Sequence, residues 1–359
     1  MVKKCRLIAY YLPQYHPIPE NDLWWGKGFT EWTNVAKAKP LFPGHYQPHI
    51  PADLGFYDLR VPETRIAQAE MAKEYGIEGF CYYHYWFAGK RLIERPFNEV
   101  LKTGEPKFPF CLCWANQSWT GIWHGASERI LIEQTYPGLE DDEKHFYTLL
   151  DAFQDYRYMK VDGRPIFMVY EAKKLPNSGR TTDSWRNLAR KAGFKDLYLV
   201  CVENDIWNPS QYGFDAVTPK SIHFARRSEV PLIGRLTRKA RKILNYPAEV
   251  FSYKKAIPYF KIPEAVKAEV HPFVIPNWDN TPRCGLDGWV LHRSTPGLFG
   301  SFLKETIGQV KDKPFDYRLV FVKSWNEWAE GNHLEPDFKY GKSYLEVLKK
   351  EVICDGNIK

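Results

Sequence analysis

Eight short apolar runs, most of them separated by segments of helical period, constrain the fold of this chain most strongly. They are rich in β-branched and aromatic residues and are continuously apolar, which is typical of parallel strands covered on both faces. The runs span Leu7–Tyr11, Gly79–Tyr85, Phe108–Trp114, Ile166–Tyr170, Leu197–Glu203, Phe214–Thr218, Pro272–Asn277 and Arg318–Trp325. Eight strand–helix units predict a (β/α)8 barrel. An open doubly wound sheet is the rival, but no GxGxxG follows the first run.

The barrel is expected to be one domain that spans residues 1–359, with insertions at about 12–62 and 221–269. Apolar stripes predict helices over 64–75, 140–155, 297–310 and 343–352. Another helix carries Trp185 and Leu188, and we expect Thr182 or Asp183 to cap its start. The insertion at 221–269 holds a basic segment, residues 226–242, with arginines and lysines in quick succession. It is either a solvated helix face or a peripheral contact for an anionic partner such as a lipid-linked glycan.

Aromatic and polar side chains gather where the predicted strands end, whereas the turns that follow the helices are plain and charged. In a barrel, the loops after the strands build the active site. Aromatic residues make up 16% of the chain, and their flat faces suit sugar rings. We therefore predict an oligosaccharide or polysaccharide substrate, bound by Tyr11, Gln14, His16, Trp24, Trp25, Trp32, His45, Tyr46, Tyr83, His84, Trp86, Trp114, Asn116, Trp119, Glu203, Asn277, Trp278, Trp325, Asn326, Trp328, His333 and Glu335.

Composition excludes several other classes of protein. The net charge of +7 is mild for 359 residues, so we expect no nucleic-acid partner. No run of 18 apolar residues occurs, and the first residues lack an apolar signal core, so a cytoplasmic protein is expected. Most of the 7 cysteines sit in apolar runs and are expected to be buried free thiols, as in a reducing compartment.

Glu327 and Glu330 are the best candidates for catalytic residues. They follow the last strand in the stretch from Ser324 to Asp337, which crowds carboxylates and tryptophans into one loop. Glycosidic-bond chemistry needs one protonated and one ionised carboxyl group, and three residues of helical turn would put both on one face. The tryptophans Trp325 and Trp328 could raise one of the two pKa values. Ion pairing or helix capping is the alternative role for Glu327.

Other chemistries lack their motifs. The chain contains no GxSxG, no P-loop, no HExxH and no Asp-x-Asp. His45 and His49 are four residues apart, but Pro48 between them argues against one helical face. We expect no metal ion and no cofactor.

Five stretches resemble the WbsX-like proteins, also called glycoside hydrolase family 99-like proteins. They are Tyr10–Asn21, Trp24–Val35, Gly44–His49, Phe80–Phe87 and Trp325–Gly331. The resemblance spans nearly the whole chain. It implies a (β/α)8 fold, an association with bacterial O-antigen and capsule synthesis, and a distant relationship to retaining endo-α-mannosidases and mannanases. Proteins of this kind are often labelled glycosyltransferases.

The resemblance also divides the roles of the two glutamates. It implies that Glu330 is the general acid/base at the glycosidic oxygen, and that Glu327 deprotonates the sugar 2-hydroxyl to give a 1,2-anhydro intermediate. The chain departs from the family pattern at Gln117, where a glutamate is usual, and at Trp123-His124-Gly125, where Trp-Asp-Gly is usual. If the missing carboxylates bind a sugar or tune a charge in the family, the substrate or the turnover of this chain differs from that of its relatives.

The sequence thus predicts a glycoside hydrolase or transglycosidase that acts on an α-linked glycan with retention. One alternative is a glycosyltransferase of lipopolysaccharide or O-antigen biosynthesis, which the basic 226–242 segment favours and the missing Asp-x-Asp disfavours. A second alternative is a non-catalytic glycan-binding barrel, which Gln117 and His124 leave open.

Overall fold

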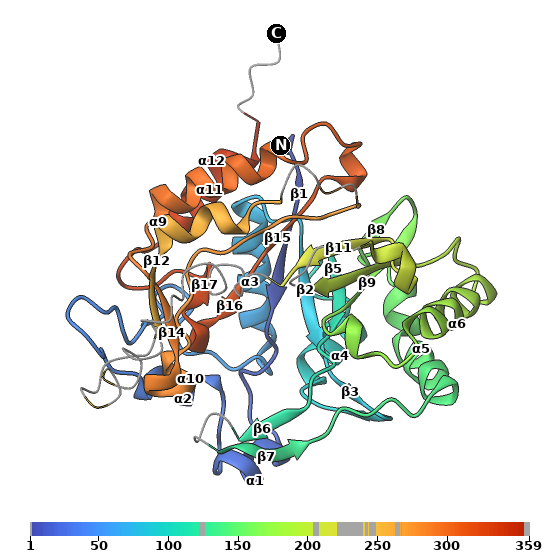
Figure 1. The fold of residues 1–359 in the computed structure, drawn as a ribbon, viewed down its shortest axis with the longest axis horizontal. Helices are drawn as coiled ribbons and strands as arrows, with labels where there is room; N and C mark the ends of the chain where they lie inside the picture. Colours follow the sequence, from blue (N-terminus) through green and yellow to red (C-terminus); the bar gives the residue numbers. More distant parts are fainter. Residues whose placement is uncertain are drawn as a thin grey trace.

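The computed structural model describes residues 2–121, 126–203, 208–220, 240, 243, 249–262, 266 and 268–354. Its centre is a ring of parallel strands (Figure 1). Their spatial order is β11 (Ala216–Pro219), β10 (Tyr198–Glu203), β9 (Arg164–Val169), β5 (Phe110–Trp114), β2 (Gly79–His84), β1 (Arg6–Tyr11), β15 (Leu319–Val322) and β13 (Phe273–Val274). Every one of the eight predicted runs overlaps one of these strands, so the predicted (β/α)8 barrel is confirmed.

A parallel bridge between Val217 and Val270 closes the ring between β11 and the segment that leads into β13. The amide of Val217 donates to the carbonyl of Glu269 at 3.0 Å, and the amide of His271 donates to the carbonyl of Val217 at 2.9 Å. The strands are buried on both faces because side chains fill the barrel and helices cover its outside.

The larger helices pack around the barrel, as Figure 1 shows. They are α3 (Pro62–Glu74), α4 (Arg95–Thr103), α5 (Leu139–Gln154), α6 (Ser178–Lys191), α11 (Pro296–Gly308) and α12 (Ser343–Val352). Of the predicted stripe on α5, Phe146, Leu149 and Phe153 are buried and Leu150 is partly buried. The predicted cap of α6 is wrong, since the Asn177 side chain accepts from the amide of Arg180 and the helix begins earlier.

Shorter elements decorate the ends of the strands. The first insertion carries α1 (Pro19–Trp25) and α2 (Glu31–Lys37). Two antiparallel hairpins follow β2 and β5, and a parallel pair lies near β13. The two hairpins are β3 (Trp86–Phe87) with β4 (Lys90–Arg91) and β6 (Trp119–Gly121) with β7 (Ala126–Ile132), and the parallel pair is β12 (Glu249–Ser252) with β14 (Trp289–His292). Other short elements are β8 (Lys160–Val161), which pairs with β9, α9 (Tyr253–Ala256) and α10 (Thr281–Cys284).

The first and last described segments of the chain lie side by side at the amino-terminal face of the barrel. Because β1 pairs with β15, the first and last strands are neighbours. The amide of Lys4 donates to the carbonyl of Val352, and the amide of Cys354 donates to the carbonyl of Val2, both at 2.9 Å. Val2 and Cys354 therefore lie at the end of the barrel opposite the carboxyl ends of the strands.

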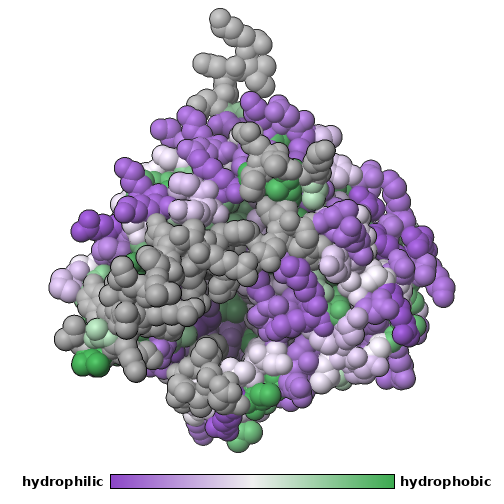
Figure 2. Space-filling model, viewed as in Figure 1, coloured by the Kyte–Doolittle hydropathy of each residue, from purple (hydrophilic) through white to green (hydrophobic). Residues whose placement is uncertain are grey.

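On the face shown in Figure 2, hydrophilic residues predominate among the coloured residues, and apolar ones are scattered between them. Among the described helices, none has both the length and the apolar character needed to cross a membrane. All 7 cysteines are free thiols, and Cys5, Cys81, Cys111, Cys113 and Cys201 are buried, as expected.

Candidate functional site

The stretch after β15 forms a tight hairpin over the carboxyl end of the barrel. Strands β16 (Asn326–Glu327) and β17 (Asn332–His333) pair antiparallel, and a 3-10 turn over Trp328–Glu330 joins them. We call residues 326–333 the glutamate hairpin. Ser324 fixes its base, because the hydroxyl donates to the carbonyl of Asn332 at 2.7 Å and accepts from the amide of Glu327 at 2.9 Å.

Two buried side chains anchor the glutamate hairpin to the rest of the barrel. The Asn326 amide spans the end of β1, accepting from the Leu12 amide at 2.7 Å and donating to the Leu12 carbonyl at 3.0 Å. The Trp328 indole donates to Oε2 of Glu335 at 2.6 Å. The hairpin carrying both glutamates is therefore held by hydrogen bonds on both sides.

Glu327 and Glu330 line one cleft, with a volume of about 570 Å³, at the carboxyl ends of the strands. The same cleft is lined by Gln14, Trp25, Tyr83, Tyr85, Gln117, Trp119, Tyr170, Arg283 and Lys323. Of the sequence-predicted binding residues, Gln14, Trp25, Tyr83 and Trp119 reach it. These lining residues come from distant parts of the chain, as expected for an active site of a barrel.

Arg283 ties two carboxylates together beside the cleft. Its Nη1 lies 2.5 Å from Oε1 of Glu330, and its Nη2 lies 2.9 Å from Oε2 of Glu31. All three side chains are largely shielded from solvent, and that of Glu31 is 0% exposed. Burial would by itself raise the pKa of Glu330, but Arg283, with a hydrogen bond from Glu327, holds that pKa below its usual range.

Glu327 has the opposite electrostatic character. Burial raises the pKa of its carboxyl group to about 8, against the nearby charge of Lys323, and the negative charge of Glu330 adds to the rise. The Lys323 ammonium lies 3.3 Å from the Tyr170 hydroxyl and over the ring of Trp278. Burial lowers the pKa of Lys323, yet Tyr170 and Glu327 raise it overall, so the ammonium stays charged. The two glutamates thus share one proton near neutral pH.

Aromatic rings form one wall of the cleft. Trp119 in β6 contacts the edges of Tyr85 and Trp24, with ring centroids 5.1 and 5.8 Å away. Trp24 therefore supports Trp119 and is not among the residues that line the cleft. Gln117, which also lines the cleft, donates to Oε1 of Glu171 at 2.6 Å. The glutamine that departs from the family pattern therefore lies in the site, whereas residues 123–125 fall outside the described residues.

Several predicted binding residues lie behind the cleft and hold it together. Tyr11 donates to Gln68 at 2.7 Å, His16 contacts the carbonyl of Pro13 at 3.0 Å, and Trp32 donates to the carbonyl of Tyr57 at 2.7 Å. Trp325, Asn326 and Trp328 are buried as well and do not line the cleft.

A second group surrounds the buried imidazole of His145. His84 lies 2.9 Å from it, Trp86 stacks on it, and the Trp114 indole donates to the carbonyl of Trp86. Burial lowers the pKa of both His84 and His145, so both rings are neutral. These three predicted residues form a packed cluster outside the cleft.

Three more of the predicted binding residues, Asn116, Glu203 and Trp278, also have structural contacts. Asn116 accepts from the amide of Glu171 at 2.7 Å, and Glu203 accepts from the amide of Lys173 at 3.1 Å. Trp278 stacks on Trp289, with ring centroids 5.3 Å apart. None of the three is among the residues that line the cleft.

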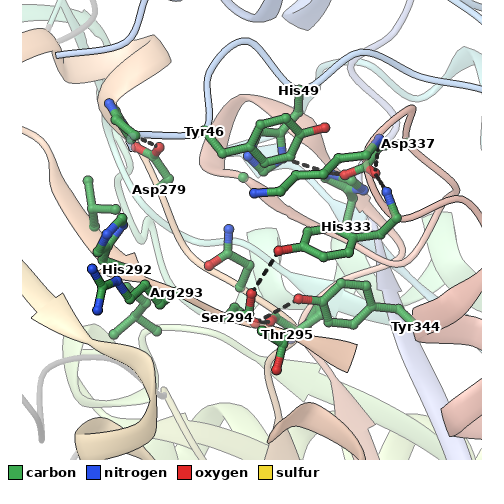
Figure 3. Close-up of a pocket in the computed structure, with 18 of the residues that line it drawn as sticks. Tyr46, His49, Asp279, His292, Arg293, Ser294, Thr295, His333, Asp337 and Tyr344 are labelled. Carbon is green, nitrogen blue, oxygen red and sulfur yellow. Dashed lines mark hydrogen bonds and ion pairs between the residues drawn. The ribbon is translucent and has the colours of Figure 1, made fainter. Parts of the chain in front are cut away.

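The other predicted residues line a second cavity of about 320 Å³ (Figure 3); they are His45, Tyr46, Asn277, His333 and Glu335. It lies behind the glutamate hairpin, since Gly331 and His333 line it. His45 and Gln47 both contact Oδ2 of Asp279, at 2.6 and 2.7 Å. The predicted binding residues therefore divide between two cavities and the walls around them.

Sequence reasoning missed Arg283, Lys323, Tyr85, Tyr170 and Glu31. Arg283 and Lys323 could have been found from the sequence, because each is a charged residue in or shortly after a predicted apolar strand. Lys323 stands within the last apolar run, and Arg283 comes a few residues after the seventh. Glu31 has no such signal, since only the fold brings it to Arg283, 252 residues away.

The solved structures most relevant to this fold are carbohydrate enzymes by name. A protein titled glycoside hydrolase-like matches with a TM-score of 0.61 and 17% identity, over 98% of this chain and 94% of that one. An endo-alpha-mannosidase of glycoside hydrolase family 99 from Bacteroides thetaiotaomicron matches with a TM-score of 0.53 and 13% identity, over 96% and 95% of the two chains. At these identities the likeness concerns the fold.

Two curated relatives come from strains of Xanthomonas campestris pv. campestris, and both carry the name "Uncharacterized protein WxcX". They are 38% and 37% identical to this chain over 346 residues, or 96% of it. The chain spans about half of their length, 49% in each case. The model of a family described as glycosyltransferase WbsX matches residues 7–348. The chain therefore belongs to the WbsX glycosyltransferase family.

Proposed function

We propose that this protein is a carbohydrate-active enzyme that cleaves or transfers an α-glycosidic bond with retention, using Glu327 and Glu330. The observation that carries the proposal is the pair itself, two hydrogen-bonded carboxyl groups with pKa values displaced in opposite directions. Inverting enzymes keep their carboxyl groups about 6.5–9.5 Å apart to hold a water molecule between them. A pair in direct contact has no such space, which favours retention.

The resting pair carries one proton and one negative charge. The proton is on Glu327, because burial raises its pKa to about 8, and the charge is on Glu330 beside Arg283. A hydrogen bond joins the two groups, so the proton can pass to Glu330 as substrate enters. Glu327 then becomes the base and Glu330 the acid, which is the division that the family resemblance implies.

In the proposed reaction, Glu327 takes the proton of the sugar 2-hydroxyl while that oxygen bonds to C1. The bond from C1 to the leaving oxygen breaks, and Glu330 gives its proton to that oxygen. A water molecule or an acceptor sugar then gives its proton to Glu330 and attacks C1. The C1–O2 bond opens, and Glu327 returns its proton to O2. Two displacements at C1 give overall retention.

The test compares Glu327→Gln and Glu330→Gln on α-glycosides with aryl and alkyl leaving groups. Both variants should lose at least about 100-fold on alkyl glycosides, as general acid–base groups do. Glu330→Gln should recover much of its rate on aryl glycosides, which depart without a proton, whereas Glu327→Gln should not. Unchanged turnover in both variants would show that the pair has no catalytic role. A reversed pattern would make Glu327 the acid.

A second candidate function is transfer from an activated donor in surface-polysaccharide synthesis, which the description of the family favours. Tight binding of a sugar nucleotide, with transfer and no hydrolysis, would support it. The bacterial relatives fit either role. Glycan binding without turnover of any donor would instead support a binding barrel.

Three finer predictions from the sequence accompany this proposal. A lipopolysaccharide or O-antigen substrate and a cytoplasmic location stay predictions. The peripheral contact with a lipid-linked glycan would use residues 226–242, most of which lie outside the described residues.

A further inference from the structure

Three metal-ligating side chains converge on one side of the second cavity. His49 comes from the first insertion, His333 from β17, and Asp337 from the segment that follows it. Figure 3 shows the three side chains grouped together. All are buried, with exposed fractions of 3%, 7% and 5%. Their candidate ligand atoms all lie within 4.8 Å of one another.

The contacts identify the atoms involved. Nδ1 of His49 lies 2.8 Å from Nε2 of His333, and Nε2 of His333 lies 3.9 Å from Oδ2 of Asp337. In a tetrahedral site with bonds of 2.0–2.2 Å, neighbouring ligand atoms are about 3.4 Å apart. The two observed separations lie on either side of this value. A shift of about half an ångström would bring each of these two separations to that value, and the third pair, His49 and Asp337, lies within 4.8 Å.

Surrounding groups already orient two of the three ligands. Nδ1 of His333 lies 2.9 Å from the carbonyl of Glu335, to which it can donate, and this leaves a bare lone pair on Nε2. Oδ1 of Asp337 accepts from the amides of Lys339 and Tyr340, at 3.0 and 2.7 Å, so that Oδ2 faces the histidines. Ligating histidines and carboxylates in metal sites are held by outer hydrogen bonds of this kind.

His49 and Asp337 are also chemically available. Once His333 donates through Nδ1, the proton between the two rings belongs to Nδ1 of His49. Nε2 of His49 is buried and has no hydrogen-bond partner within the described residues. Moving the proton there breaks no existing bond at Nε2. The Tyr46 hydroxyl is hydrogen-bonded to Asp337, but among the described residues no lysine or arginine forms an ion pair with this carboxylate, so no such side chain balances its negative charge.

We propose that His49, His333 and Asp337 bind one divalent transition-metal ion of the zinc class. The ligand atoms are Nδ1, Nε2 and Oδ2, and the fourth position opens to the second cavity, where water or another oxygen ligand completes it. The residues are far apart in the sequence, His49 and His333 by 284 positions, so no ligand spacing in the sequence could reveal the site.

The ion would join the first insertion to the glutamate hairpin. His333 pairs with Asn326 across the hairpin, and its ring stacks on Trp328 with centroids 3.7 Å apart. The site is therefore a structural brace behind the catalytic cleft, and it does not depend on the chemistry proposed for Glu327 and Glu330.

The test uses the full 359-residue chain, stripped with a chelator and titrated with Co²⁺ alone and then Zn²⁺. The expected result is one ion per chain, a visible absorption band typical of four-coordinate Co²⁺, and loss of that band when Zn²⁺ displaces it. Zn²⁺ should raise the Tm of the stripped protein, and a chelator should reverse the rise.

Two ligand variants and one matched control make the test specific. His49→Ala and Asp337→Asn should weaken binding by at least tenfold, whereas His292→Ala, which alters the same cavity away from the cluster, should not. Circular dichroism tests whether each variant folds. If a variant does not fold, the Co²⁺ absorption band of the wild-type protein alone tests the proposal. Absence of a Co²⁺ band at 100 micromolar ion would overturn the proposal, and so would equal affinity in all three variants.

Discussion

Replacing Arg283 with methionine should destabilise the protein strongly, because it leaves two shielded carboxylates without their partner. Arg283 contacts Glu330 at 2.5 Å and Glu31 at 2.9 Å, and Glu31 is fully buried. Removing one member of a buried ion pair costs about 3–5 kcal/mol. Unfolding entropy of about 2.1 cal/mol/K per residue gives roughly 0.75 kcal/mol/K for a chain of this length, so the Tm should fall by about 4–7 °C.

The loss should depend on pH with a definite sign. Arg283 lowers the pKa of Glu330. A carboxyl group whose pKa is lower in the folded protein stabilises the fold at pH values above the pKa that the group has in the unfolded chain. That contribution disappears as pH falls through the pKa of the folded state. The difference in unfolding free energy between wild type and Arg283→Met should therefore be largest near pH 7 and shrink toward pH 4.

Urea unfolding followed by tryptophan fluorescence from pH 4 to 7.5 measures this difference. Arg60→Met is the matched control, since Arg60 also pairs with a carboxylate, Asp58 at 2.6 Å, but its side chain is 40% exposed. Exposed pairs contribute about 0–1 kcal/mol. If both variants lose the same free energy, or if the loss in Arg283→Met does not change with pH, the reasoning about the buried pair fails.

Three further predictions concern the glutamate hairpin. Glu335→Gln should lower the unfolding free energy by about 1–3 kcal/mol in urea, because its carboxylate accepts from an amide, a hydroxyl and an indole, and the new NH₂ group would face a donor; an unchanged midpoint would contradict this. Gly331→Ala should cost more than Gly341→Ala in thermal unfolding, since both have positive φ but only the Cβ at Gly331 would meet the Cβ of Asp279, at 2.9 Å. With Glu327 holding the resting proton, kcat/KM should fall as pH rises through about 8, and a rate that is flat from pH 6 to 9 would exclude this role.

The barrel was predictable because its signals are local. Each strand is a continuous apolar run, and most of the larger helices could be predicted from the period of neighbouring residues, although α4 was not among them. The start of α6 could not be predicted from the sequence, because Asn177 and Thr182 are both residue types that cap helices well and only packing decides between them. The two glutamates could be found for the same local reason, since one short loop holds both.

The rest of the site depends on contacts between distant segments. Trp325 and Trp328 were predicted to bind substrate because they flank the glutamates, yet the hairpin turns their rings into the protein. Arg283 acquires its role only when α10 meets α2 and the hairpin. The second cavity likewise joins residues from both halves of the chain. Residue type predicted that aromatic and polar side chains gather on this face, but not which side chain reaches which cavity.

The adjacent chain ends bear on how a longer protein could be arranged. The relatives from Xanthomonas are about twice as long as this chain. Lys4 and Val352 are hydrogen-bonded neighbours on the face of the barrel opposite the cleft. A module that continues the chain beyond Val2 or Cys354 would be joined through that face, so a long glycan could enter the cleft without meeting the linker. A fusion partner or an immobilisation tag at either end should for the same reason leave access to the cleft open.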